Sequence, residues 1–206
     1  MATKYVALCL LSVMVFVLNR VDSRGLKQAN INTVPELNIN YYAGRWYEMF
    51  SDLIVKETFE RNSYCTTATY GKISETNVTV FNSGRKGSPT GPASEISGYA
   101  YVADPAQPGQ LKLQLTGTPL GDYWVIELGP VEDNEYQYAV VTEPLMLQLF
   151  ILARDPQVFR QKYQDQVLDF VQKAGFNKFW NKPKETVQVP GCIYPPPPSG
   201  KVFFRI

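Results

Sequence analysis

The sequence predicts an all-β fold, an eight-stranded up-and-down antiparallel β-barrel with one C-terminal α-helix packed outside it. Eight strand-like runs, separated by turn residues, follow one another at the spacing typical of consecutive antiparallel strands. A single amphipathic helical stripe comes only after the last of these runs. Eight strands enclose an interior just wide enough for one small ligand, so the fold itself predicts a binding cavity.

The chain begins with the pattern of a secretory signal peptide. Lys4 precedes a continuous apolar stretch, Tyr5–Leu18, which is too short to span a membrane, and small residues follow before Arg24. The alternative is an uncleaved membrane anchor. With cleavage, we expect a secreted, extracellular protein. The predicted divisions are a signal peptide at 1–23, a barrel domain at 24–192 and a Pro-rich, apolar tail at 193–206.

Removal of the leader leaves a chain with balanced charge and two cysteines. The whole chain has 20 basic and 19 acidic residues, and cleavage removes two basic residues and one acidic residue, which leaves 18 of each. This balance provides no electrostatic footprint for nucleic acid or for an anionic membrane. Because Cys9 leaves with the leader, Cys65 and Cys192 are expected to pair in an oxidising compartment. Asn77 begins the only glycosylation sequon, whose use requires exposure.

An N-terminal segment that ends in Val34-Pro35-Glu36-Leu37 is expected to cross the barrel floor, and the strands follow it. Alternation of apolar and polar residues is clearest around Val78 and Val80. The predicted strands are Arg45–Leu53, Tyr64–Ile73, Asn77–Asn82, Ser94–Ala103, Leu111–Leu115, Asp122–Leu128, Tyr136–Val141 and Leu147–Ala153. The Gly- and Pro-rich run Ser83–Pro92 is expected to be a loop.

One helix is expected after the last strand. Asp155 can cap its N-terminus, Pro156 suits the first turn, and Gly175 suits the position just past its end. Apolar residues recur at helical spacing, so one face is expected to pack on the outside of the barrel. These residues are Phe159, Tyr163, Val167, Phe170, Val171 and Ala174.

A Gly-x-Trp motif stands at the head of the first strand. Gly44 allows a tight turn, and the indole of Trp46 can then close the barrel floor if its N–H finds a partner. The motif is common by chance, but a basic residue, Arg154, stands at the end of the last strand. A guanidinium over the indole gains a cation–π contact and can donate to backbone carbonyls at this end. These three residues are expected to be structural.

With these residues in place, the chain resembles the lipocalin family, and within it the branch of apolipoprotein D and the related outer-membrane and plant-type lipocalins. The resemblance covers about Leu37–Cys192 and includes four segments in the family's order, which are Gly44–Glu48, Asp122–Ile126, Tyr136–Val141 and Ile151–Pro156. Cys65 and Cys192 match the bridge that the resemblance implies between the second strand and the C-terminal segment. One departure, Leu128–Asp133 in place of the family's Thr-Asp-Tyr segment, predicts a closed-end loop with its own geometry.

The chain lacks histidine, which is the commonest general base and the commonest protein ligand of metals and haem. This absence excludes Ser-His-Asp and Cys-His arrangements, and a thiol nucleophile would need one of the two paired cysteines to be free. No pair of carboxylates stands out for acid–base chemistry. We therefore expect neither an enzyme nor a metal site.

The resemblance implies a ligand site in the barrel interior. It places a pocket tyrosine at Tyr70, a pocket asparagine at Asn82, and apolar lining residues at Leu115 and Phe150. The alternatives are plain core packing for Tyr70 and Phe150, and a turn position for Asn82. A largely apolar lining with a few polar groups suits a lipid, steroid, retinoid or tetrapyrrole.

The sequence therefore predicts a secreted protein that binds and transports a small hydrophobic ligand, such as a lipid, a fatty acid or a steroid- or retinoid-like molecule. One alternative is a chromoprotein with a bound bilin, which is a tetrapyrrole, or a carotenoid; otherwise no cofactor is expected. The other alternative is a protein that acts through its surface.

The surface alternative rests on the predicted barrel mouth and on the tail. The mouth loops lie around Leu53–Val55, Ser83–Pro92, Pro119–Leu120 and Pro144–Met146. Three of these four carry large apolar residues, which suggests docking on a lipid particle, a membrane surface or a partner, unless the loops fold inward and narrow the entrance. The tail, with Phe203 and Phe204, either frays or docks.

Overall fold

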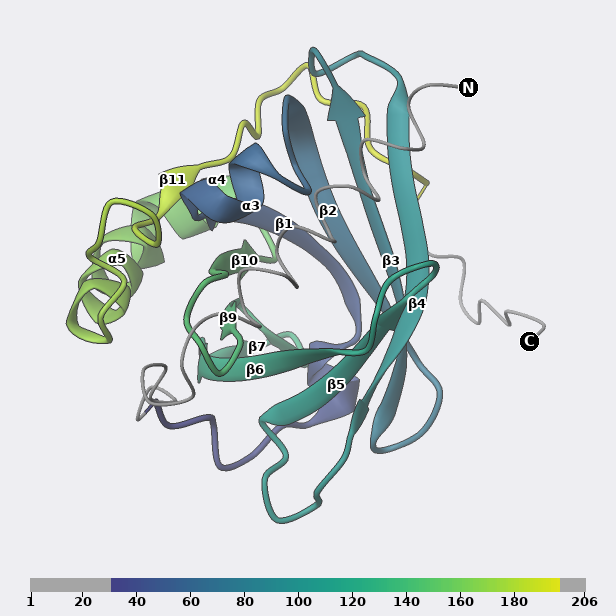
Figure 1. The fold of residues 1–206 in the computed structure, drawn as a ribbon, viewed down its shortest axis with the longest axis vertical. Helices are drawn as coiled ribbons and strands as arrows, with labels where there is room; N and C mark the ends of the chain where they lie inside the picture. Colours follow the sequence, from purple (N-terminus) through teal and green to yellow (C-terminus); the bar gives the residue numbers. More distant parts are fainter. Residues whose placement is uncertain (1–30, 197–206) are drawn as a thin grey trace, which may run out of the picture.

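The computed structural model describes residues 31–196 and shows a closed antiparallel barrel (Figure 1). The barrel strands are β1 (Gly44–Ser51), β2 (Ser63–Lys72), β3 (Asn77–Lys86), β4 (Ala93–Val102), β5 (Gln110–Leu115), β6 (Gly121–Leu128), β9 (Tyr138–Thr142) and β10 (Phe150–Ala153). Each of these strands pairs with the next, and β10 returns to pair with β1. The predicted eight-stranded up-and-down barrel is confirmed. The signal peptide and the Phe203-Phe204 end of the tail lie outside the described residues.

The remaining elements lie at the ends and on the outside of the barrel. They are α2 (Ile39–Tyr42), α3 (Leu53–Glu57), the β7–β8 hairpin (Val131–Glu132 and Glu135–Tyr136), α4 (Pro156–Val158), the π-helical turn η1 (Phe159–Tyr163), α5 (Gln164–Lys173) and β11 (Lys184–Glu185). We call the end with the β1–β2, β3–β4, β5–β6 and β9–β10 connections the mouth, and the opposite end the floor. None of the helices in residues 31–196 is long and apolar enough to cross a membrane.

The barrel wall separates two hydrophobic clusters because successive side chains of a strand point to opposite faces. In β6, Tyr123 and Val125 belong to the interior cluster, whereas Trp124 and Ile126 belong to the outer cluster. Burial on both faces explains why this strand is almost continuously apolar.

The predicted helix lies outside the barrel and covers the outer cluster (Figure 1). The carboxylate of Asp155 accepts from the backbone N–H groups of Gln157 and Val158, and Gly175 follows the helix with a φ of 105°. The apolar stripe is confirmed, with four residues buried and two half-buried. The buried ones are Phe159, Tyr163, Val167 and Val171, and the half-buried ones are Phe170 and Ala174.

The predicted end of the third strand is wrong. β3 continues to Lys86, so the predicted loop is confined to residues 87–92. Ser83 pairs with Thr67 on one side and with Glu95 on the other. A central strand with a partner on each side overrides the weak intrinsic strand preference of Ser and Gly.

Other predicted boundaries also differ from the structure. The first strand ends at Ser51, because the side chain of Asp52 accepts from the backbone N–H of Val55 and caps the short helix α3. The last strand begins at Phe150 instead of Leu147. The backbone N–H of Leu147 donates to the carboxylate of Glu143, so a side chain replaces the strand ladder there.

The predicted strand Tyr136–Val141 is divided between two elements. Glu135 and Tyr136 form β8, which pairs with β7, whereas β9 starts at Tyr138. Asp133 and Asn134 have φ angles of 50° and 62°, which is typical of a two-residue hairpin turn. This hairpin includes the end of Leu128–Asp133, the segment that departs from the family pattern and for which the sequence predicts a separate loop geometry.

The C-terminal segment completes the wall near the mouth, where β1 pairs with β11 instead of β2. The amide of Gln188 donates to the carbonyl oxygens of Glu48 in β1 and Thr66 in β2. The predicted disulfide between Cys65 and Cys192 is confirmed, with a Cα–Cα distance of 5.6 Å.

The start of the predicted tail lies against the barrel. The Arg45 guanidinium donates to the carbonyl oxygens of Pro195 and Pro196, and the ring of Tyr194 packs edge-on against Tyr47. Residues 193–196 are therefore attached to the outer wall.

Candidate ligand-binding cavity

Trp46 closes the floor of the barrel. Its side chain is fully buried, and its indole N–H donates to the carbonyl oxygen of Tyr42 over 2.8 Å. The N-terminal segment also crosses this end, because the backbone N–H of Val34 donates to Val125 of β6 and Leu37 packs against the interior cluster. The predicted crossing of the floor is confirmed.

The guanidinium of Arg154 lies 3.8 Å from the centroid of the Trp46 ring. It donates to five carbonyl oxygens, which belong to Tyr41, Tyr42, Ala43, Arg45 and Tyr136. Gly44 has a φ of 104°, and a Cβ there would lie 2.9 Å from Nη1 of Arg154. Both the turn and the close approach of the guanidinium therefore require glycine.

Some inward-facing side chains at the mouth are less buried than side chains deeper in the barrel. Val78 and Val80 of β3 and Leu111 of β5 are each 1% exposed. Leu115 and Phe150, at the mouth ends of β5 and β10, pack against the same cluster but are only half-buried. Solvent therefore reaches the barrel interior at the mouth ends of these two strands, and we call this solvent-reached part of the interior the hollow.

Asn82 lies in this hollow, one inward position closer to the mouth than Val80. It pairs with Ala68 of β2 and Ile96 of β4, so it is a strand residue and the alternative of a turn position is wrong. Its side-chain oxygen is buried and has no hydrogen-bond partner among the described residues. A buried amide oxygen without a donor is costly, so this atom is suited to accept from a molecule in the hollow.

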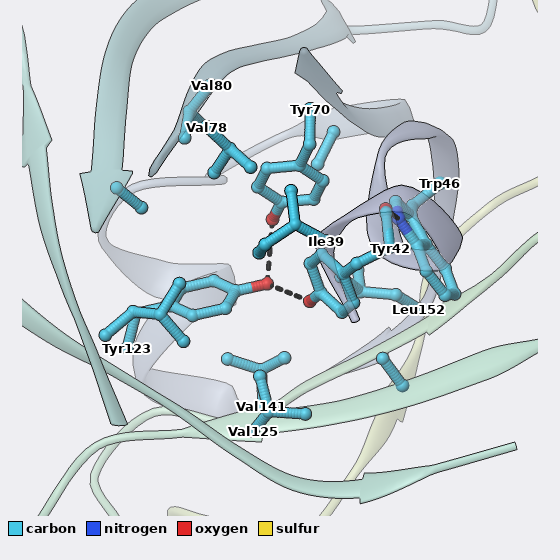
Figure 2. Close-up of a cluster of buried hydrophobic side chains, with 14 residues drawn as sticks. Ile39, Tyr42, Trp46, Tyr70, Val78, Val80, Tyr123, Val125, Val141 and Leu152 are labelled. Carbon is cyan, nitrogen blue, oxygen red and sulfur yellow. Dashed lines mark hydrogen bonds between the residues drawn. The ribbon is translucent and has the colours of Figure 1, made fainter. Parts of the chain in front are cut away.

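Tyr70 lies deeper, in β2 opposite Val80, and its hydroxyl belongs to a cluster of three tyrosines (Figure 2). The Tyr123 hydroxyl lies 2.5 Å from that of Tyr42 and 2.8 Å from that of Tyr70. Tyr42 comes from α2 on the floor and Tyr123 from β6, so three elements supply this hydroxyl cluster. All three side chains are buried, with exposed fractions of 1% for Tyr42, 4% for Tyr70 and 8% for Tyr123.

The hydroxyl cluster is uncharged at neutral pH. Burial raises the pKa of Tyr70 to about 12, and it raises the pKa of Tyr42 and of Tyr123 well above the usual value. Arg154 opposes this rise for Tyr42 and Tyr70 because its positive charge favours the phenolate. The three oxygens therefore keep their protons.

Sequence reasoning placed Tyr70 inside the barrel but missed Tyr42 and Tyr123. Alternation in β6 would have found Tyr123, since the polar neighbour Asp122 pairs with Lys112 on the outer wall. Tyr42 had no comparable signal, because the direction of a side chain on the four-residue helix α2 depends on the path across the floor.

A second polar group lies near the mouth, where β1, α3 and the C-terminal segment meet. The ammonium of Lys56 lies 2.9 Å from a carboxylate oxygen of Glu48 and 3.3 Å from one of Glu60, and the Thr186 hydroxyl also donates to Glu48. Despite burial, Lys56 and its neighbours lower the pKa of Glu48. Burial and the nearby charge of Glu48 raise the pKa of Glu60 well above its usual value.

The mouth loops differ in how they place their apolar residues. Val55 is fully buried, whereas Leu120 and Leu145 are 51% and 37% exposed. The structure adds Phe179 and Trp180, which were not predicted and are 72% and 49% exposed. The neighbouring Asn181 donates to the carbonyl oxygen of Met146, so this pair lies beside the β9–β10 loop.

Asn77 is half-buried at the start of β3, and its side-chain oxygen accepts from the Thr76 hydroxyl. Its glycosylation stays a prediction, as do the ligand roles of Tyr70, Asn82, Leu115 and Phe150. Within residues 31–196, no group of three or more Cys, Asp or Glu side chains is placed to share a metal ion.

Comparison with known proteins agrees with this architecture. Residues 37–183 match the model of the lipocalin-like domain family. The chain is 30% identical over 148 residues to the outer membrane lipoprotein Blc of Vibrio cholerae. The aligned region covers 72% of this chain and 82% of that protein. It is also 30% identical over 161 residues to temperature-induced lipocalin-1 of Arabidopsis thaliana, and the aligned region covers 72% of this chain and 79% of that protein.

Two solved structures show the same fold at low sequence identity. Lobster apocrustacyanin A1 has a TM-score of 0.53 at 16% identity, over 83% of this chain and 96% of that one. The amine-binding protein of Rhodnius prolixus has a TM-score of 0.53 at 17% identity, over 81% of this chain and 89% of that one. On the family match, the floor geometry and the closed barrel, this chain belongs to the lipocalin family of β-barrels that bind small hydrophobic molecules.

Proposed function

We propose that this protein carries a single small hydrophobic molecule, such as a lipid or fatty acid, in its barrel and performs no chemistry on it. The observation that supports this proposal is the decrease in burial from Val80, near the floor, to Phe150 at the mouth. An apolar ligand in this hollow gains about 25 cal/mol for each Å² of apolar surface that it removes from water. Leu115 and Phe150 supply apolar wall, and Asn82 supplies a polar contact.

The disulfide supports the further proposal that the protein is secreted. A bridge between Cys65 and Cys192 persists in an oxidising compartment, and the chain begins with the pattern of a signal peptide.

Native mass spectrometry of protein purified from its own source tests carriage directly. We expect an additional mass that organic extraction removes, and this mass identifies the ligand class. A tetrapyrrole or carotenoid mass, together with a visible absorption band, would instead support the pigment-binding alternative. A barrel that stays empty both from the source and after incubation with fatty acids would contradict the proposal.

A charge in the apolar wall gives a second test. Phe150→Asp places a carboxylate at the half-buried wall position and should reduce binding of a fluorescent fatty acid by at least about tenfold, because burial of an unpaired charge is costly. Ile73→Asp is the matched control, since Ile73 is 57% exposed and lies at the floor end of β2. Equal affinity in the two variants would exclude Phe150 from the site.

A second candidate function is docking of the mouth on a lipid surface. Leu120, Leu145, Phe179 and Trp180 are exposed apolar residues near this end. Lys178 and Lys182 flank the aromatic pair and are exposed, and no described acidic side chain lies within 4.0 Å of either ammonium. Exposed aromatic residues beside lysines suit an interface with anionic lipid headgroups.

Vesicle sedimentation separates this candidate from simple carriage. Trp180→Ala should weaken association with vesicles that contain phosphatidylserine while leaving fatty-acid binding unchanged. Ile73→Ala provides a control at the opposite end of the barrel. No association of the wild-type protein with these vesicles would remove the docking candidate and leave carriage intact.

A further inference from the structure

The hydroxyl cluster of Tyr42, Tyr70 and Tyr123 has one more proton than its hydrogen bonds use. Each neutral hydroxyl donates one hydrogen bond, and two bonds connect the three oxygens. No hydrogen bond of normal length joins Tyr42 to Tyr70 directly, and no other described group accepts from the cluster. One O–H therefore has no acceptor among the described residues.

The spare proton is best placed on Tyr123. If both flanking hydroxyls donate to Tyr123, its own O–H is free to point into the hollow. Tyr123 is also the most exposed of the three, at 8% compared with 4% for Tyr70 and 1% for Tyr42. A buried donor without an acceptor costs on the order of 1–3 kcal/mol, so a ligand atom that accepts from it gains selectivity.

The surroundings favour an oxygen acceptor over an ammonium group. The residues around the cluster are apolar, and the charged group whose field acts on Tyr42 and Tyr70 is the guanidinium of Arg154 on the floor. Its positive charge opposes a ligand cation and favours a partly or fully negative oxygen. The acidic neighbour of Arg154 is Glu135, whose side chain is 47% exposed and lies outside the interior cluster.

We propose that the Tyr42–Tyr70–Tyr123 hydroxyl cluster is a polar subsite of the barrel interior, deeper than Asn82, and that Tyr123 donates to a carbonyl or carboxylate oxygen of the ligand. The ligand then lies with its oxygen-bearing end toward the floor and its hydrocarbon part toward Leu115 and Phe150. This inference rests on the proposed carrier function and specifies the ligand class for it.

Three ligands with the same chain test the subsite. They are myristic acid, its methyl ester and tetradecane, each measured by displacement of a bound fluorescent probe. Tyr123→Phe should weaken binding of the ester or the acid roughly 3- to 10-fold, which is the effect of one hydrogen bond. The affinity for tetradecane should not change. The ester has the acceptor without the charge, so its response relative to the acid separates carbonyl recognition from carboxylate recognition.

A further variant controls this experiment. Tyr99→Phe removes a hydroxyl from an exposed residue that stacks on Tyr101 on the outer wall, and it should have no effect. Equal loss for all three ligands in Tyr123→Phe would overturn the proposal, because that result indicates altered packing.

An infrared measurement on the wild-type protein needs no variant. The carbonyl band of bound, carbon-13-labelled methyl myristate should lie below its position in an alkane solvent, as it does when the oxygen accepts a hydrogen bond. An unshifted band would overturn the subsite while leaving carriage supported. If none of the three ligands displaces the probe from the wild-type protein, the carrier function itself fails.

Discussion

Replacement of Arg154 by lysine tests how the floor of the barrel is held together. The Arg154 side chain is 7% exposed, donates to five backbone carbonyls and covers the face of Trp46. An ammonium keeps the charge, but its three donors are at one point. It therefore cannot reach Tyr136 on one side and the carbonyls of Tyr41 and Ala43 on the other.

The size of the effect follows from the contacts that are lost. At least two carbonyls lose their donor, at about 1–2 kcal/mol each, and the stacked guanidinium contributes about 1 kcal/mol more. The free energy of unfolding should fall by about 3–5 kcal/mol. At about 2–4 °C per kcal/mol for a domain of this size, Tm should fall by roughly 6–20 °C.

Thermal unfolding followed by circular dichroism measures this change, and urea unfolding gives the free energy. Arg160→Lys is the matched control, because Arg160 is 35% exposed and contacts Glu185 and the carbonyl oxygen of Gln188 at the surface. We expect its Tm to stay within about 2 °C of wild type, as for an exposed ion pair. The reasoning is refuted if the Tm of Arg154→Lys is as high as that of this control.

Three other substitutions test the remaining structural claims. Trp46→Ala should lower the free energy of unfolding by about 3–5 kcal/mol because it leaves a cavity at the floor; an unshifted Tm would contradict the role of Trp46 there. Cys192→Ser opens a bridge between residues 127 positions apart and should cost about 4–5 kcal/mol in urea unfolding, with no further loss on addition of dithiothreitol. Glu60 takes up a proton on folding because its folded pKa is raised above the usual 4.5, so stability should fall as pH rises from about 4.5 through the raised pKa. Glu60→Gln should flatten this part of the pH profile, whereas Gln at the exposed Glu57 should leave it unchanged; equal slopes in both variants would contradict the assignment.

The barrel topology could be predicted because its determinants are local or separable in the sequence. Turn residues delimit the strands, and alternation assigns their faces, as for Val78 and Val80 of β3. The capping residue Asp155 and the apolar stripe that follows predict the outer helix. With Cys9 assigned to the predicted leader, the two remaining cysteines leave one pairing, which the structure confirms.

Strand limits and the interior needed the tertiary structure. Ser83 and Gly84 have turn propensity, yet they belong to β3 because Ser83 pairs with both neighbouring strands and Gly84 pairs with Ser94 of β4. The opposite occurs before β10, where the carboxylate of Glu143 binds the backbone N–H of Leu147 and delays the strand. A neighbouring strand is distant in the sequence, and the direction of a side chain such as Glu143 cannot be read from it. Propensity alone therefore misplaces the strand boundary.

The sequence by itself predicted the closed barrel and the floor contact of Trp46 with Arg154, and its lack of histidine excludes histidine chemistry; the signal peptide stays a prediction. Only the tertiary structure decided which polar groups share the interior. Tyr42, Tyr70 and Tyr123 come from a floor helix and two strands that are far apart in the chain. Their hydroxyls meet because the barrel closes and the N-terminal segment crosses its floor, and no local pattern encodes that distance.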